Sequence, residues 1–173
     1  MRVLLLSDTH GALDPRILEQ ARASEVVVHA GDVGAAAVLS ALRAACPRVV
    51  AVRGNNDVPA KWPAAQRAAL GALDGSATLD LPGGTLVAVH GDSFAPARRH
   101  ARLRAAYPHA RAIVYGHSHR LCVDDGERPW VLNPGAAGRS RTFGGPSCLL
   151  LDADEAAWSV HAVRFVDARA DRA

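Results

Sequence analysis

The sequence has few cysteines and lacks long apolar runs. Its 173 residues include only Cys46, Cys122 and Cys148. These are odd in number and far apart, and none forms a C-x-x-C pair, so neither a disulfide framework nor a zinc knuckle is indicated. No apolar stretch is long enough to cross a membrane, and the run at residues 3–6 is too short for a signal-peptide core. We therefore expect a protein of a reducing compartment, the cytoplasm, with no membrane partner.

The sequence also has little excess charge. A formal net charge of +3 suits a phosphate-bearing partner but does not demand nucleic acid. Because no additional nucleic-acid-binding domain is evident, a nuclease is the weaker interpretation. The hydrophobic fraction of 49% and charged fraction of 21% are typical of globular proteins. The length predicts one domain, which we place at residues 1–166, followed by a frayed tail at 167–173.

Apolar and helical patterns alternate in the first third of the chain. This alternation predicts parallel strands joined by right-handed crossovers, and the later part is mostly β. We therefore expect an α/β (α+β) fold of two packed mixed β-sheets flanked by helices, a four-layer sandwich. The predicted strands are 3–7, 26–30, 49–53, 78–81, 85–90, 112–115, 121–124, 130–132, 147–152 and 158–166, and the predicted helices are 15–23, 35–46 and 95–107.

Five of the apolar runs end in residues that bind metals. The endings are "SDTH", "AGD", "GNND", "VHGD" and "GHSH". Sites in α/β proteins form at the carboxyl ends of strands, and ionisable residues are costly there unless they are used. The seven candidate ligands are Asp8, His10, Asp32, Asn55, His90, His117 and His119.

The spacing and chemistry of these ligands favour two metal ions. Residues i and i+2 leaving a strand point to the same side, so Asp8 and His10 can face one centre, as can His117 and His119. Seven oxygen and nitrogen ligands are too many for one tetrahedral ion but suit two ions that share a carboxylate. With no cysteine in the set, we expect divalent transition metals, manganese first, with nickel, iron, cobalt or zinc also fitting.

In this order the motifs resemble those of the calcineurin-like metallophosphoesterases, in particular their small prokaryotic single-domain phosphodiesterase branch. The resemblance extends over about residues 1 to 138, since "LNPGA" at 132–136 is similar to the family's NPGS element. It implies a metal-dependent phosphoric diester hydrolase. It also implies that one metal is held by Asp8, His10, Asp32 and His119, and the other by Asp32, Asn55, His90 and His117, with Asp32 bridging.

One departure from the family pattern bears on catalysis, whereas a second, Ala136 in place of a serine, is expected to have little effect. Many members carry a histidine where this chain has Asn56, and an amide cannot protonate a departing oxygen. Two ions ~3.5–4 Å apart would hold a bridging hydroxide that attacks phosphorus in line. No residue of the motifs is then assigned to protonate the leaving group. We therefore predict a preference for small phosphodiesters with good leaving groups. Asp57 follows the ligands and is expected to orient its neighbours.

Three further assignments stay open. Arg53 precedes "GNND" and is expected either to contact a substrate phosphate or to form a surface ion pair. The exposed later strands allow pairing across a homodimer. The alternative function is a non-catalytic scaffold for protein partners on the same fold, as in a retromer subunit with a similar fold, although scaffolds tend to lose ligands and this chain retains all seven.

Overall fold

The computed structural model describes residues 1–166 and places ten strands in two five-stranded sheets. In the first sheet the strand order is β10-β9-β1-β2-β3. β1, β2 and β3 run parallel, whereas β9 and β10 are antiparallel to their neighbours. The strands of this sheet are β1 (Arg2–Leu6), β2 (Val26–His29), β3 (Val49–Ala51), β9 (Ser147–Ala153) and β10 (Trp158–Arg164).

The second sheet has the order β4-β5-β6-β8-β7. β5, β6 and β8 are parallel, and β4 and β7 pair antiparallel at its two edges. Its strands are β4 (Ser76–Leu81), β5 (Gly84–Val89), β6 (Ala112–Tyr115), β7 (Cys122–Asp124) and β8 (Trp130–Asn133). Each sheet therefore contains a parallel core, so several strands present their carboxyl ends at the same edge.

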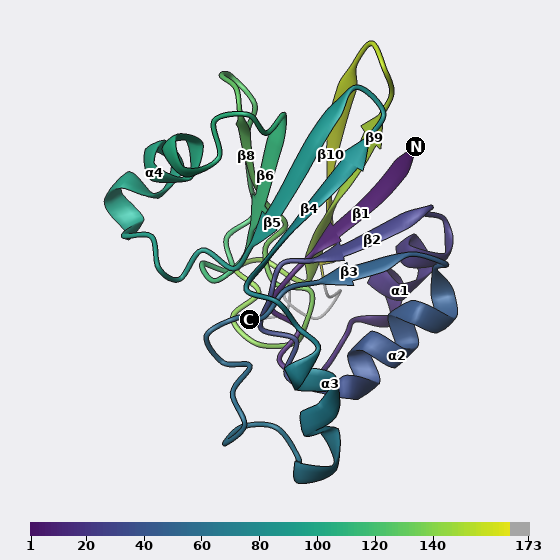
Figure 1. The fold of residues 1–173 in the computed structure, drawn as a ribbon. Helices are drawn as coiled ribbons and strands as arrows, with labels where there is room; N and C mark the ends of the chain where they lie inside the picture. Colours follow the sequence, from purple (N-terminus) through teal and green to yellow (C-terminus); the bar gives the residue numbers. More distant parts are fainter. Residues whose placement is uncertain (167–173) are drawn as a thin grey trace, which may run out of the picture.

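Helices cover the outer face of each sheet (Figure 1). Leu4 and Leu6 on the outer face of β1 pack with Ile17 of α1 and Leu39 of α2. On the far side of the molecule, Leu103 of α4 packs against the second sheet. The helices are α1 (Pro15–Arg22), α2 (Ala36–Ala45), the 3₁₀ turn η1 (Ala64–Gln66), α3 (Arg67–Gly71), the 3₁₀ turn η2 (Pro96–Arg98) and α4 (Arg99–Ala106).

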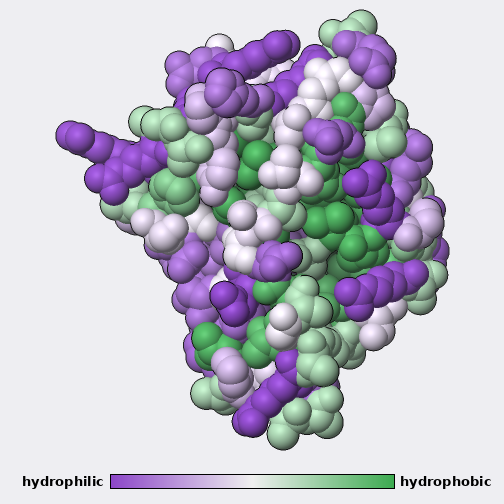
Figure 2. All heavy atoms as spheres, in the orientation of Figure 1, coloured by the Kyte–Doolittle hydropathy of each residue, from purple (hydrophilic) through white to green (hydrophobic). Residues whose placement is uncertain are grey.

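The main apolar core lies between the two sheets. Leu5 and Val28 from the first sheet join Leu86 and Val114 from the second in one buried cluster. This explains the continuous apolar runs of the sequence, because strands covered on both faces have no polar side. Figure 2 shows apolar atoms reaching the surface over the region of β3 and β4, the edge strands of the two sheets, with hydrophilic side chains around them.

The predicted fold class is confirmed: two mixed sheets are packed together and flanked by helices. The predicted strands and helices are present with small shifts at their ends. The predicted helix at 95–107 begins as the 3₁₀ turn η2 before α4. The predicted frayed tail at 167–173 lies outside the described residues. Within residues 1–166, no helix is both long enough and apolar enough to traverse a bilayer.

The sequence did not predict η1 and α3, which occupy the loop after β3. α3 has five residues, of which only Leu70 is buried. A single buried side chain produces no helical periodicity, so the pattern that identifies amphipathic helices is missing here.

Candidate metal centre

The predicted ligands follow the carboxyl ends of five strands drawn from both sheets. Asp8 and His10 follow β1, Asp32 follows β2 and Asn55 follows β3, all in the first sheet. From the second sheet, His90 follows β5, and His117 and His119 follow β6. The loops after β1, β2 and β3 gather at the lower centre of Figure 1. The two sheets thus contribute to one polar edge of the molecule.

Four of these side chains form a compact cluster. Ligand atoms of Asp8, His10, Asp32 and His119 all lie within 4.8 Å of one another. The Nε2 of His119 is 3.3 Å from Asp8 Oδ1, and the Nε2 of His10 is 3.8 Å from Asp32 Oδ2. Asp8 and Asp32 are almost fully buried. Two buried carboxylates and two imidazoles are a suitable set for a divalent transition metal.

The remaining three predicted ligands meet at the Asn55 amide oxygen. The Nε2 of His90 lies 3.0 Å from Asn55 Oδ1, and the Nδ1 of His117 lies 3.1 Å from the same atom. His90 Nε2 is also 3.4 Å from Asp32 Oδ2. Asp32 Oδ2 therefore lies between the two groups, within 4 Å of a histidine from each.

Left-handed backbone shapes this edge. Five of the seven predicted ligands have positive φ: Asp8 (55°), His10 (46°), Asp32 (56°), His117 (65°) and His119 (57°). Two neighbouring glycines allow the loops to approach closely. A Cβ at Gly54 would lie 2.3 Å from Asp32 Oδ1, and one at Gly116 would lie 2.9 Å from Asp8 Oδ2. Only glycine fits at these two contacts with the carboxylates.

Burial keeps most of the histidines neutral. It lowers the pKa of His10 and of His117, and burial together with the charge of Arg141 lowers the pKa of His119 to about 4. Burial also raises the pKa of Asp8 to about 7. A neutral imidazole offers a lone pair, which is the form that binds metal.

His90 is the exception among these histidines. Burial acts to lower its pKa, but the hydrogen bond to Asp32 and the charges of Asp32 and Asp8 outweigh burial and raise it. Conversely, burial acts to raise the pKa of Asp32, and hydrogen bonds from His90 and Asn56 overcome that effect and hold it below its usual range. This part of the site is therefore arranged to hold a positive charge.

Hydrogen bonds to backbone carbonyls fix which ring nitrogen faces the site. His90 Nδ1 lies 2.9 Å from the Ala30 oxygen, and His119 Nδ1 lies 3.2 Å from the Ser140 oxygen. A carbonyl only accepts, so each Nδ1 carries hydrogen and each Nε2 points to the cluster. This orientation by a second partner is typical of histidines that bind metals.

Asn56 and Asp57 contact the loops around the cluster. The Asn56 backbone N–H donates to Asp32 Oδ1 at 2.8 Å, and its Nδ2 donates to Asp32 Oδ2 at 2.7 Å. The buried Asp57 carboxylate accepts hydrogen bonds from three backbone N–H groups and from the indole of Trp62. Asp57 thus joins the loop after β2 to the loop after β3.

Arg53 forms no ion pair or side-chain hydrogen bond within residues 1–166. Its backbone N–H donates to the Asp74 oxygen at 2.7 Å, and its side chain lines a hollow beside Asn55. The predicted alternative of a surface ion pair is therefore not found in the described part of the chain.

Sequence reasoning missed two cations at the site. The Nη2 of Arg141 lies 3.1 Å from His119 Nε2, and Lys61 Nζ donates a hydrogen bond to Asn56 Oδ1. Arg141 belongs to the loop between β8 and β9, and Lys61 to the loop after β3. No sequence motif marks either residue, because the conformation of a loop places each side chain beside the cluster.

Comparison with known proteins agrees with this geometry. Residues 1–156 match the model of the calcineurin-like phosphoesterase superfamily domain. No match was found among curated proteins.

Three solved structures show the same fold. Vps29 from Entamoeba histolytica complexed with zinc is 19% identical with a TM-score of 0.74, and the match covers 95% of this chain and 98% of that one. A predicted phosphoesterase from Streptococcus pneumoniae is 20% identical with a TM-score of 0.66, covering 94% and 88%. An archaeal phosphodiesterase is 19% identical with a TM-score of 0.70, covering 94% and 100%.

Proposed function

Because this chain belongs to the calcineurin-like phosphoesterase superfamily, we propose that it is a phosphodiesterase that uses two divalent metal ions. The observation that carries the proposal is the position of Asp32. Its Oδ2 lies 3.8 Å from His10 Nε2 and 3.4 Å from His90 Nε2. One carboxylate placed between two sets of donor atoms suits a bridging ligand. We expect manganese first, and nickel, iron, cobalt or zinc also suit these donors.

The contacts around His90 test whether a cation fits. Its Nδ1 donates to the Ala30 carbonyl, so its Nε2 faces Asn55 Oδ1 and Asp32 Oδ2, which are both acceptors. Three acceptor atoms facing one another repel unless a proton or a metal ion lies among them. The residues present therefore fit a metal. Asp8, His10, Asp32 and His119 would hold one ion, and Asp32, Asn55, His90 and His117 the other.

Metal ions bound here supply an activated water as nucleophile and positive charge for the phosphoryl oxygens. The chain's own residues hold this arrangement in place. The carbonyl of Ser140 orients His119, and Asn56 holds both oxygens of Asp32. Arg141 lies beside His119, where its guanidinium can bind a substrate phosphoryl oxygen.

Two features favour diesters over alkyl monoesters. Asn56 cannot donate a proton to a poor leaving group. In addition, two hollows adjoin the cluster. One of about 490 Å³ includes Asn55, and another of about 470 Å³ includes His117 with Arg99 and Arg120. A phosphodiester has two ester arms, and two hollows beside one phosphoryl position provide space for both.

The test compares two substrates on manganese-loaded protein. We expect kcat/KM for a bis-aryl phosphate to exceed that for an alkyl monoester by at least tenfold. Asp32→Ala and His117→Ala should abolish hydrolysis, whereas His161→Ala should retain it, because His161 is exposed on β10 far from the cluster in sequence and has no side-chain partner within residues 1–166. A preference for the monoester would contradict the argument from Asn56.

The alternative is a scaffold that binds protein partners and performs no chemistry. Elemental analysis of the untreated protein, run beside the activity assay, separates the two. Bound metal together with turnover supports the enzyme. Bound metal without turnover on any diester, across a panel of divalent ions, supports the scaffold.

A further inference from the structure

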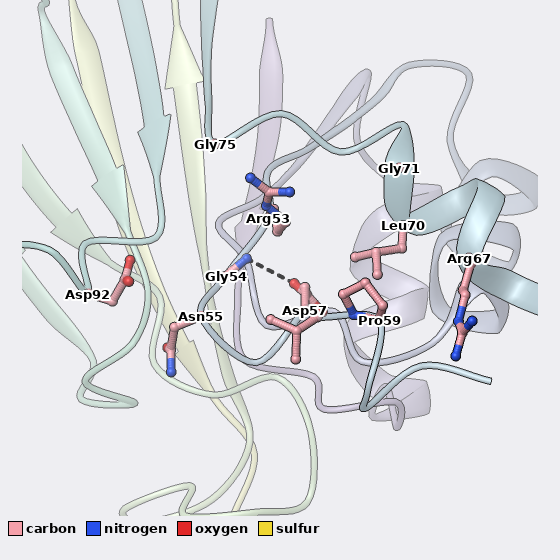
Figure 3. Close-up of a pocket in the computed structure, with 11 residues that line it drawn as sticks. Arg53, Gly54, Asn55, Asp57, Pro59, Arg67, Leu70, Gly71, Gly75 and Asp92 are labelled. Atoms are coloured by element: carbon pink, nitrogen blue, oxygen red, sulfur yellow. Dashed lines mark hydrogen bonds between the residues drawn. The ribbon is translucent and has the colours of Figure 1, made fainter. Parts of the chain in front are cut away.

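The hollow beside Asn55 has two chemically different sides (Figure 3). Asn55 and Asp92 lie on the side of the candidate metal centre. Arg67, from α3, lies on the opposite side, and Arg53 lies between them. A molecule that fills this hollow therefore extends from the metal ligands to a pair of arginines.

The two arginines are unpaired within residues 1–166. Both side chains are exposed, and neither the Arg53 nor the Arg67 guanidinium makes a hydrogen bond or ion pair there, so both are available to a ligand in the hollow. The Arg67 guanidinium, at the end of the hollow away from Asn55, matches a phosphate, because a phosphomonoester carries close to two negative charges and guanidinium binds it through paired hydrogen bonds.

Part of the remaining lining is apolar, and the rim is open. Val58, Pro59 and Leu70 contribute carbon surface to the lining, and Pro59 and Leu70 lie between Asn55 and Arg67. At Gly71 and Gly75 an added Cβ would meet no atom within 4 Å, so the rim is not filled by neighbouring residues. A hollow of about 490 Å³ is of the size that holds a small organic ligand. Apolar surface of this kind suits a ring.

The floor of the hollow is held firmly. The Asp57 carboxylate, at its base, accepts from the backbone N–H groups of Gly54, Val33 and Gly34 and from Trp62 Nε1. Four hydrogen bonds to one buried carboxylate fix the loop that carries Arg53 and Asn55. The positions of the metal ligand and of the first arginine are thus set together.

We propose that this hollow binds one arm of the substrate phosphodiester and that this arm is a nucleoside carrying a phosphate of its own. The inference rests on the proposed function. In the reaction, water attacks the phosphorus of the internal diester, the P–O bond to one arm breaks, and the departing oxygen takes a proton from solvent water, since Asn56 cannot supply one. The products are a phosphomonoester and an alcohol, one of which keeps the terminal phosphate against Arg67. Short phosphorylated oligonucleotides, starting with dinucleotides, are the substrate class.

The first experiment uses three dithymidine phosphodiesters: one without a terminal phosphate, one phosphorylated at the 5′ end and one at the 3′ end. On manganese-loaded protein we expect kcat/KM to be at least tenfold higher for one of the phosphorylated forms. Arg67→Gln should reduce that preference below threefold. Arg43→Gln is the matched control, because Arg43 is exposed on α2 away from the hollow and has no ion-pair partner in the described part of the chain, and it should preserve the preference.

A second measurement needs no turnover. In titration calorimetry on metal-free protein, thymidine 3′,5′-bisphosphate should bind at least tenfold more tightly than thymidine 5′-monophosphate, and Arg67→Gln should remove the difference. Hydrolysis of all three dinucleotides at equal rates would overturn the proposed arm while leaving the phosphodiesterase intact. Arg67-dependent binding of the bisphosphate without hydrolysis of any diester would support the subsite and refute the proposed function.

Discussion

The ring nitrogens of His10 and His119 face each other across 109 residues of sequence. Their Nε2 atoms lie 3.2 Å apart, and the rings stack with centroids 5.0 Å apart. Since His119 Nδ1 is used by the Ser140 carbonyl, its Nε2 has only a lone pair to offer. Arg141 donates to that lone pair at 3.1 Å, which places the arginine in competition with a metal ion for the same atom.

Replacing Arg141 should therefore strengthen metal binding. We expect Arg141→Gln to lower the Kd for manganese about fivefold, because a cation leaves the vicinity of His119 and His10. The same change should weaken inorganic phosphate binding to the metal-loaded protein. Arg139→Gln, two residues earlier and exposed, is the control and should change neither value. Weaker manganese binding in Arg141→Gln would show that the arginine supports the site rather than competing for it.

Introducing a proton donor at Asn56 should broaden the substrate range. Asn56→His places an imidazole beside Asp32, where the amide now donates to Oδ2. General acid catalysis contributes about 10²–10⁴-fold where the leaving group is poor. We expect kcat for an alkyl monoester to rise at least tenfold, with a smaller change for a bis-aryl diester. Equal gains on both substrates would refute the role assigned to the missing histidine.

Asp57 should be among the most important residues for stability. Asp57→Ala leaves three buried donors and one half-buried donor without an acceptor, and each unsatisfied buried group costs about 1–3 kcal/mol. Urea unfolding should show a loss of at least about 3 kcal/mol in the free energy of unfolding. Trp62→Phe removes one donor and should cost about 1 kcal/mol. Asp92→Ala, at an exposed side chain, is the control and should stay within about 0.5 kcal/mol.

His29 should make the protein less stable in mild acid. Burial lowers its pKa to about 4, and the ionisable groups around it are Asp57, Asp32, His90 and His10. Its Nε2 contacts Thr9 Oγ1 at 2.9 Å, and its Nδ1 has no hydrogen-bond partner within residues 1–166. As the pH falls below 6.5, His29 is protonated in the unfolded chain but stays neutral in the folded chain. The contribution of His29 to the free energy of unfolding therefore decreases by about 3 kcal/mol in total as the pH falls to 4, and it levels off below pH 4.

The measurement for His29 is urea unfolding of metal-free protein between pH 4 and 7. Wild type and His29→Gln are compared, so that the contributions of other groups cancel. The variant should lose less stability on acidification than wild type does. His161→Gln, at an exposed position of β10, is the control and should follow wild type. Parallel curves for wild type and His29→Gln would contradict a buried neutral imidazole.

The ligand cluster could be predicted from sequence because it depends on strand ends. Asp8, Asp32 and Asn55 each follow a short apolar run, and parallel strands bring their carboxyl ends to one edge. The short continuous apolar runs identify the strands, and the polar residues that end them identify the candidate ligands. Local pattern and tertiary position agree at these residues.

Arg141, Lys61 and Arg67 could not be predicted in this way. Each is a single basic residue in a loop or a short helix, and its place at the site depends on the path of the chain between elements. A lone arginine in a loop has the same local pattern whether it faces solvent or a phosphate. The clustering of the candidate ligands could therefore be predicted from the sequence, whereas the positions of these three cations depend on the path of the loops.

The left-handed backbone at Asp8, His10, Asp32, His117 and His119 has an evolutionary consequence. Glycine accepts positive φ without steric penalty, whereas other residues pay about 1 kcal/mol or more. A lineage that no longer needed metal would gain folding free energy by drifting toward glycine or asparagine at these five positions. If carboxylates and imidazoles are retained at these positions among related sequences, that retention would indicate selection for chemistry, and it can be examined without an activity assay.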